Sequence, residues 1–253
     1  MPKKKNKKKS KKKKKIAKKL YNKKTVETKL HSELIYKVKN EWEKKALVNK
    51  SEYVKKYKQS IKDNDGFWKK EGKRITWIKP YTKIKDVKYS KEHVHIKWYY
   101  DGTLNASANC IDRHLKKNKD KTAIIWVGDD PKVQKKITYK QLHYEVCKAA
   151  NGLKELGITK GDRVTIYLTM IPELAYTMLA CARIGAIHSI IFGGFSPDSI
   201  SGRINDCKSD YVITADEGLR GGKTIPLKSI TDEALVKCPN VKKCIVVKRT
   251  GNR

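Results

Sequence analysis

From residue 122 onward, hydrophobic positions alternate between short continuous runs and patterns that repeat every three or four residues. Continuous apolar runs of this length predict buried strands, and the three-to-four repeat predicts one apolar face of a helix. The predicted strands cover residues 122–127, 163–169, 186–192, 210–214 and 244–247. The predicted helices begin near Thr138, Pro172 and Ser196, and a further one covers residues 228–237. Strands that alternate with amphipathic helices predict an α/β domain, in which a parallel sheet is covered by helices on both faces.

The residues that flank these segments indicate where two of the helices begin. Thr138 and Gln141 have the spacing of a capping box, in which each side chain accepts a hydrogen bond from the other residue's backbone. Ser196 followed by Pro197 is typical of an N-cap residue and a proline in the first helical position. Residues 135–138 can form a strand that returns antiparallel to the first predicted strand.

The chain before residue 122 has a less regular pattern. Leu34, Val38, Trp42, Tyr53 and Tyr57 recur at helical spacings, which predicts helix around residues 32–59. The segment 60–100 carries aromatic residues separated by charges and single turn residues, so we expect a meandering layer that packs aromatic side chains onto a domain. The expected parts are a tail over residues 1–30, a helical and aromatic region over 31–115, and the α/β domain over 116–253.

The net charge of +34 changes the picture at the N-terminus. Residues 1–50 contain 21 Lys and four Glu, so a fifth of the chain carries half of the net charge. Residues 3–15 are eleven Lys broken by Asn6 and Ser10, and without apolar side chains to offset the entropy of ordering they are expected to be disordered. Two interpretations stay open: residues 3–19 bind polyanions nonspecifically through counterion release, or they reflect a bias in composition without a binding function. No specific nucleic-acid recognition is expected, because Arg, Gly and aromatic residues are not interleaved with the Lys.

Other compositional features bear on location. No run of eighteen apolar residues occurs, so no membrane span is predicted. The N-terminus has the charge of a secretory signal but lacks the apolar segment that must follow. The six Cys include no C-x-x-C pair, which argues against a zinc ribbon or a thioredoxin-like redox site. We expect buried thiols in a reduced, cytoplasmic protein.

Two glycine-containing stretches follow predicted strands, where ligands bind in parallel sheets. FGGFS (192–196) offers backbone that can approach a ligand closely, followed by a helix N-terminus that favours an anion. ADEGLRGGK (215–223) is expected to be a flexible loop in which Arg220 and Lys223 flank two glycines, a combination that suits phosphate groups. Each stretch alone is more often a plain surface loop in a chain so rich in Lys. Their positions one strand apart make a phosphorylated ligand and a plain surface loop equally expected.

Common catalytic motifs are absent from the sequence: it has no G-x-x-x-x-G-K-[ST], no G-x-S-x-G and no H-E-x-x-H. The histidines are scattered, so each is expected to be partnered or exposed rather than a metal ligand. The adjacent residues Asp112 and Arg113 are expected to form a structural ion pair rather than an acid–base pair.

Several separated stretches resemble one known family. WYYDGTLNASANCIDRHL (98–115) resembles a signature of AMP-forming acetyl-CoA synthetases. IFGGFSPDSISGRIND (191–206) and VITADEGLRGGKTIPLK (212–228) are similar to the same enzymes nearly residue for residue. Further similar stretches are residues 57–68, 77–87 and 246–251. The resemblance covers about residues 50–253.

This resemblance implies part of an adenylate-forming domain and a ligase that makes acetyl-CoA from acetate, ATP and CoA. In that family, acetate attacks the α-phosphorus of ATP with Mg²⁺ assistance, and the CoA thiol then displaces AMP from acetyl-adenylate. The implied CoA-binding residues are Phe192 beside the adenine, Gly193 and Gly194 close to it, Arg220 and Lys223 on the phosphates, and Gly221 and Gly222 between them. No catalytic residue and no metal ligand is implied within this chain.

The resemblance also implies that the chain corresponds to the N-terminal portion of such an enzyme. The family's phosphate loop, acetate pocket, metal site and mobile C-terminal domain have no counterpart in the sequence. We therefore expect a fragment or a degenerate gene product that is inactive alone in acetate-dependent ATP–pyrophosphate exchange. Two alternatives stay open: a propionate–CoA ligase of the same family, and a noncatalytic ligase remnant that binds polyanions through its Lys tail.

Overall fold

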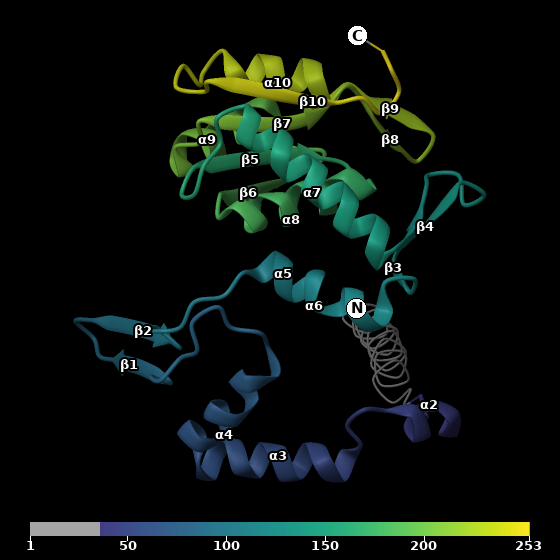
Figure 1. Ribbon diagram of the computed structural model, residues 1–253. Helices are drawn as coiled ribbons and strands as arrows, with labels where there is room; N and C mark the ends of the chain where they lie inside the picture. The colour runs from purple at the N-terminus through teal and green to yellow at the C-terminus, as the bar shows by residue number, and fades with distance from the viewer. Residues whose placement is uncertain (1–35, 253) are drawn as a thin grey trace, which may run out of the picture. The chain divides into compact units, whose positions relative to one another are not determined.

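The computed structural model describes residues 36–252 (Figure 1). The chain forms two compact units, residues 1–64 and residues 65–253, and each is described by itself. The predicted tail over residues 1–30, including the Lys run at 3–15, lies outside the described residues. The expected division of the folded chain after residue 115 stays a prediction.

The described part of the first unit contains two helices, α2 (Asn40–Lys45) and α3 (Lys50–Lys62). The sequence predicted helix across residues 32–59, but the chain leaves the helix after Lys45 and starts a new one at Lys50. The reason is local: the Asn49 side chain accepts a hydrogen bond from the Glu52 backbone, and the Glu52 side chain accepts one from Asn49, which completes a capping box. The apolar side chains of both helices are exposed.

The boundary between the units falls after the first residue of α4 (Asn64–Glu71). The second unit continues with a 3-10 turn (Gly72–Arg74) and an antiparallel hairpin of β1 (Lys85–Tyr89) and β2 (Val94–Trp98). Charged residues separate the aromatic ones here, as expected, but the sequence did not indicate the hairpin. The rings pack on one another: Tyr81 lies 4.9 Å from Trp77 and 4.5 Å from Tyr99 between ring centroids. Gly72 and Gly102 are glycines because a Cβ at either would come within 3.0 Å of these rings.

The centre of the second unit is a four-stranded parallel sheet with the order β10-β7-β5-β6. Its strands are β5 (Arg163–Leu168), β6 (Ile187–Phe192), β7 (Tyr211–Ala215) and β10 (Lys243–Val247). All five residues of β7 are buried in succession, which requires cover on both faces of the sheet. The predicted α/β class and four of the five predicted strands are therefore confirmed as one parallel sheet.

Four helices connect and cover these strands: α7 (Tyr139–Glu155), α8 (Pro172–Ile184), α9 (Pro197–Cys207) and α10 (Leu227–Leu235). Helix α7 packs on α8, and α9 packs on α10. The predicted helix starts are confirmed, because Thr138 and Gln141 form the capping box of α7 and Ser196 caps α9 ahead of Pro197. Buried residues of α7, including Val146, face the same core as Ile166 of β5.

Two further hairpins lie outside the parallel sheet. Strand β3 (Thr122–Val127) pairs antiparallel with β4 (Gln134–Thr138), so the first predicted strand belongs to a separate ribbon. The stretch expected to be a flexible loop at 215–223 instead contains β8 (Gly218–Arg220), paired with β9 (Lys223–Ile225). Gly221 and Gly222 have φ values of 59° and 73°, which is the two-residue turn that matches the twist of a hairpin. Two glycines between short alternating segments are therefore a hairpin signal rather than a sign of flexibility.

The signature at 98–115 is built around two asparagines that join separate elements. Asn105 Nδ2 donates to the carbonyls of Ala182 and Arg183 at the end of α8, at 3.2 and 3.0 Å. Asn109 exchanges two hydrogen bonds with the backbone of Thr76, at 2.7 and 2.8 Å. The short helix α5 (Ala106–Cys110), which Asn105 caps, thus connects the aromatic segment to the α/β domain.

The expected ion pair between Asp112 and Arg113 is wrong. Asp112 begins α6 (Asp112–Asn118), and its two carboxylate oxygens accept hydrogen bonds from the two terminal nitrogens of Arg183 on α8. His143 Nε2 lies 3.4 Å from the same carboxylate. Arg113 instead donates to Asn109 Oδ1 at 3.1 Å. Neighbours in a helix point in different directions, so a partner 71 residues away reaches Asp112 more easily than the next residue does.

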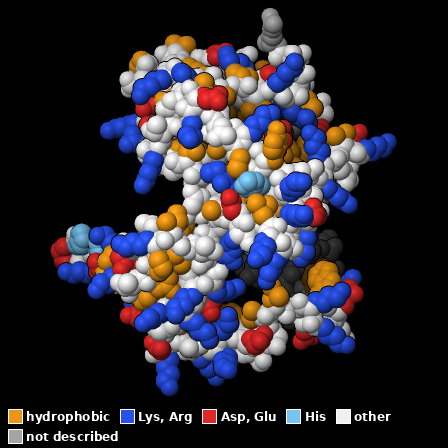
Figure 2. Space-filling view, viewed as in Figure 1, with side chains coloured by type: hydrophobic (Ala, Val, Ile, Leu, Met, Phe, Trp, Pro, Cys, Tyr) orange, Lys and Arg blue, Asp and Glu red, His pale blue; other side chains and the backbone are white. Residues whose placement is uncertain are grey.

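Two smaller expectations concern thiols and membrane segments. All six Cys are free, but only Cys181 and Cys238 are buried, and Cys110 is exposed, so the expectation of buried thiols holds for two of them. Within residues 36–252, no helix has the length and hydrophobicity needed to cross a membrane. In the space-filling view, Lys and Arg side chains are scattered over the visible face rather than gathered in one patch (Figure 2).

Candidate functional site

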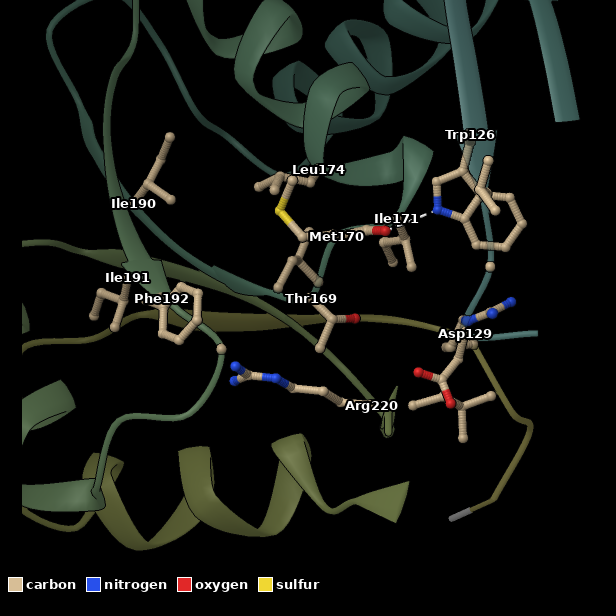
Figure 3. Close-up of a pocket in the computed structure, with 16 residues that line it drawn as sticks. Trp126, Asp129, Thr169, Met170, Ile171, Leu174, Ile190, Ile191, Phe192 and Arg220 are labelled. Carbon is tan, nitrogen blue, oxygen red and sulfur yellow. Dashed lines mark hydrogen bonds between the residues drawn. The ribbon is translucent and has the colours of Figure 1, made fainter. Parts of the chain in front are cut away.

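A cavity of about 390 Å³ opens at the carboxyl ends of β3, β5, β6 and β8 (Figure 3). Loops that follow strands of a parallel sheet meet at this edge, which is where ligands bind in open α/β folds. The polar and aromatic residues that line it are Trp126, Asp129, Thr169, Phe192, Arg220 and Arg249. Leu168, Ile171 and Leu174 contribute apolar surface. The cavity therefore combines aromatic rings with two guanidinium groups.

Two of the residues predicted for the site meet here. The guanidinium carbon of Arg220 lies 5.3 Å from the centroid of the Phe192 ring, and Figure 3 shows the Arg220 side chain extending toward that ring. Phe192 is 57% exposed, so the ring is available to a ligand. A Cβ at Gly194 would stand 3.6 Å from the Phe192 ring and 3.7 Å from Arg220 Nη1. Gly194 thus keeps the space beside this cation–aromatic pair open.

The other predicted residues occupy the turn between β8 and β9. Gly221 and Gly222 are its two central residues, and Lys223 pairs with Arg220 across it. Asp129 Oδ1 accepts the Gly221 N–H at 2.7 Å, and Oδ2 accepts the Gly222 N–H at 2.8 Å. These hydrogen bonds, from Gly222 first and then from Gly221, hold the pKa of Asp129 below its ordinary value. The carboxylate is therefore charged at neutral pH and already occupies the backbone donors of the turn.

A second carboxylate, that of Asp216, holds the backbone of Arg249, which also lines the cavity. Asp216 is buried and accepts backbone N–H groups from Arg249 at 2.8 Å and Gly251 at 2.7 Å. Burial acts to raise the pKa of Asp216, but hydrogen bonds from four backbone N–H groups outweigh it and leave the pKa lowered. With its backbone held, Arg249 extends over the Trp126 ring, 5.3 Å from the ring centroid. Trp126 itself is oriented by a 2.8 Å hydrogen bond from its indole nitrogen to the Met170 carbonyl (Figure 3).

Thr169, which follows β5, lines the cavity and lies between the two glycine-containing loops. Its methyl carbon would lie 3.3 Å from a Cβ at Gly193 and 2.4 Å from a Cβ at Gly218. Its hydroxyl oxygen is buried and has no hydrogen-bond partner among the described residues. The close approach of Thr169 explains why the chain needs glycine at the start of β8.

A methyl group added at Gly218 is expected to lower the free energy of unfolding by about 1–2 kcal/mol. The reason is the 2.4 Å approach to the Thr169 methyl, with Leu227 3.4 Å away on another side. Urea denaturation of Gly218→Ala, followed by circular dichroism, measures the loss. Thr169→Ser removes the methyl carbon that clashes, so the double variant is expected to recover most of the stability. A double variant as unstable as Gly218→Ala would show that Thr169 is not the cause.

The structure thus brings together Phe192, Gly193, Gly194 and Arg220, whereas Lys223 lies on the turn outside the cavity lining. Sequence reasoning missed Trp126, Asp129 and Arg249. The sequence did carry one signal for Trp126 and Asp129. Trp126 lies at the end of β3 and Asp129 follows it, just as Phe192 lies at the end of β6. Among the described residues, no group of three or more His, Cys, Asp or Glu side chains is arranged to hold a metal ion.

Comparison with known proteins agrees with the motifs on which the resemblance was based. Residues 111–252 match the family described as AMP-binding enzyme, and residues 53–110 match the family described as acetyl-coenzyme A synthetase N-terminus. An acetyl-coenzyme A synthetase from Parvibaculum lavamentivorans is 62% identical over 220 residues, which are 87% of this chain and 34% of that protein. The corresponding protein from Bradyrhizobium diazoefficiens is 58% identical over 222 residues, covering 88% of this chain and 34% of that protein. The chain therefore spans about a third of the length of the curated relatives it matches.

The fold also matches a solved structure. An acetoacetyl-CoA synthetase from Streptomyces lividans superimposes with a TM-score of 0.69 over 78% of this chain and 30% of that protein, at 24% sequence identity. This similarity confirms the fold, and the family match over residues 111–252 covers more than half of the chain. On these grounds the chain belongs to the AMP-binding enzyme family, and the segment that precedes its AMP-binding region matches the acetyl-coenzyme A synthetase N-terminus family.

Proposed function

We propose that this chain is the N-terminal part of an AMP-forming acetate–CoA ligase, and that its cavity binds the nucleotide end of CoA. In the proposed reaction an acetate oxygen attacks the α-phosphorus of ATP, an O–P bond forms and pyrophosphate leaves. The CoA sulfur then attacks the acyl carbon of acetyl-adenylate, and AMP leaves with the electron pair of the broken C–O bond. Acetate, ATP and CoA are the substrates of this proposal.

The observation that carries the proposal is the Phe192–Arg220 pair at the edge of the sheet. An exposed aromatic ring offers a surface for a base, and a guanidinium beside it offers a fork of donors for phosphate oxygens. Both lie at the end of strands in a chain that is about 60% identical to proteins named acetyl-coenzyme A synthetase. We assign Phe192, Gly193 and Gly194 to the nucleotide end of CoA and Arg220 to its phosphates, with Lys223 beside Arg220 on the turn that Gly221 and Gly222 form.

The proposed reaction also uses Mg²⁺ with ATP. When bound, Mg²⁺ neutralises charge on the phosphate oxygens. The described residues do not fit a metal site, since their carboxylates and histidines form no cluster of three or more. None of them is therefore assigned to the metal.

Titration calorimetry of the full chain with CoA tests the binding site directly. We expect CoA and adenosine 3′,5′-bisphosphate to bind and to compete with one another, because they share the nucleotide end. Pantetheine, which has the thiol arm without the nucleotide, is expected not to compete. Inorganic pyrophosphate in excess controls for charge alone, which the Lys-rich sequence makes necessary. Binding of pantetheine as tight as that of CoA, or loss of all CoA binding in pyrophosphate, would contradict the proposal.

A further inference from the structure

One carboxylate joins two hairpins that are far apart in the sequence. Asp129 follows β3, and its two oxygens accept the N–H groups of Gly221 and Gly222, 92 and 93 residues further along the chain. Both glycines belong to the turn that connects β8 to β9. The turn that carries Arg220 and Lys223 is therefore attached to the β3–β4 ribbon through the Asp129 side chain.

Paired backbone donors at such a turn favour an anion. Successive residues with positive φ direct their N–H groups toward one side, and the concavity they form attracts negative groups. Here the anion is supplied by the protein, because the Asp129 carboxylate fills this position. A phosphate that enters the cavity then meets the side chain of Arg220 rather than the backbone of the turn.

We propose that Asp129 is a positioning residue for the binding of phosphate-bearing nucleotides in this cavity: it holds the β8–β9 turn so that Arg220 extends across the cavity toward Phe192. The nature of the ligand rests on the proposed function. Asp129 acts through the turn, and Arg220 supplies the contact. A group that is held before binding loses less conformational freedom when the ligand arrives, which is the advantage of a fixed turn.

Whether removal of the Asp129 charge weakens or strengthens ligand binding separates positioning from simpler roles of Asp129. A carboxylate at the mouth of a site for an anionic ligand repels it, so if Coulomb repulsion dominated, removal of the charge would strengthen binding. The same result would follow if ligand phosphates competed with the carboxylate for the two glycine N–H groups. Positioning predicts weaker binding, because a released turn must be ordered again at the expense of affinity.

The test compares three variants of the full chain by calorimetry with CoA. Asp129→Asn keeps the size of the side chain but has one acceptor oxygen instead of two, and we expect it to weaken CoA binding about fivefold to twentyfold. Asp129→Glu keeps the carboxylate and is expected to recover part of the affinity. Asp130→Asn is the matched control: it removes the same charge one residue away, where Oδ1 accepts the N–H of Lys132 at 2.9 Å. Its CoA affinity is expected to be unchanged or slightly higher.

A second measurement without ligand follows the turn itself. Amide hydrogen exchange over residues 218–225 is expected to accelerate in Asp129→Asn and to stay unchanged in Asp130→Asn. Wild-type CoA affinity in Asp129→Asn, or an increase, would overturn the inference and leave the proposed function intact. A wild-type chain that binds no CoA at all would remove the proposed function and this inference together.

Discussion

Replacing Arg220 with alanine is expected to weaken CoA binding tenfold to a hundredfold, the largest loss from any single change in the cavity. A charge-assisted hydrogen bond to phosphate contributes about 1.5–3 kcal/mol, and about 1.4 kcal/mol corresponds to a factor of ten in affinity. Arg220 lies beside the exposed Phe192 ring, so its loss removes both a phosphate contact and the cation that borders the aromatic surface. Calorimetry with CoA measures the change.

Arg203 provides a matched control for this variant. Its guanidinium carbon lies 4.6 Å from the Phe195 ring centroid, so Arg203→Ala also removes one positive charge and one arginine–aromatic contact, but outside the cavity lining. We expect its CoA affinity to stay within about twofold of the wild type. Lys223→Ala is expected to fall between the two, because Lys223 lies on the turn and its flexible ammonium is more easily replaced by water. Equal losses in Arg220→Ala and Arg203→Ala would mean that net charge, not the cavity, governs binding.

The sheet was predictable from the sequence because its signals are local and mutually consistent. Strand β7 is a continuous apolar run, so its burial on both faces can be read without knowledge of its partners. The starts of α7 and α9 were predictable for a similar reason, since capping uses residues only three apart. The β8–β9 hairpin was missed although its signal was equally local: two glycines were interpreted as flexibility when they fit the two positive φ angles of a tight turn.

The candidate site was predictable only in part. The sequence indicated Phe192 and Arg220, because each stands next to glycines after an apolar stretch. It placed Asp129 after a predicted strand but could not reveal its role, because the hydrogen bonds that give this residue its role reach 92 and 93 residues along the chain. Arg249 was missed for the same reason, since its position beside Trp126 depends on the buried Asp216. Contacts between hairpins and loops carry no periodicity, so a pattern in one segment does not reveal them.

The sequence likewise did not show what the residues of the signature at 98–115 do. The signature resembles that of a known family, and in the structure its residues form contacts that hold elements together. Its Asp112 binds Arg183 through both carboxylate oxygens. Arg183 stands at the end of α8, just before β6 begins, and therefore at the opposite edge of the sheet from the cavity. A change at this ion pair is thus expected to affect stability and to leave ligand binding alone.

Asp112→Ala is expected to lower the free energy of unfolding by about 2–3 kcal/mol, between the values for exposed and fully buried ion pairs. The two side chains are 35% and 22% exposed, so the pair is only partly screened by water. The cost comes mainly from the arginine that is left behind, because Arg183 Nε is already buried without a hydrogen-bond partner in the described part of the chain. Urea denaturation of the full chain measures the loss.

A double-mutant cycle shows whether the lone guanidinium is the cause. Arg183→Leu keeps an apolar side chain at this position of α8 and removes the charge, so Asp112→Ala combined with Arg183→Leu is expected to be more stable than the sum of the two single losses. Exact additivity, or a single Asp112→Ala loss below about 0.5 kcal/mol, would show that the pair contributes no more than an exposed one. Calorimetry with CoA on the same variants is expected to give wild-type affinity, since the ion pair and the cavity lie at opposite edges of the sheet. Weaker CoA binding by a folded Asp112→Ala protein would instead mean that the signature at 98–115 acts on the site through the length of α8.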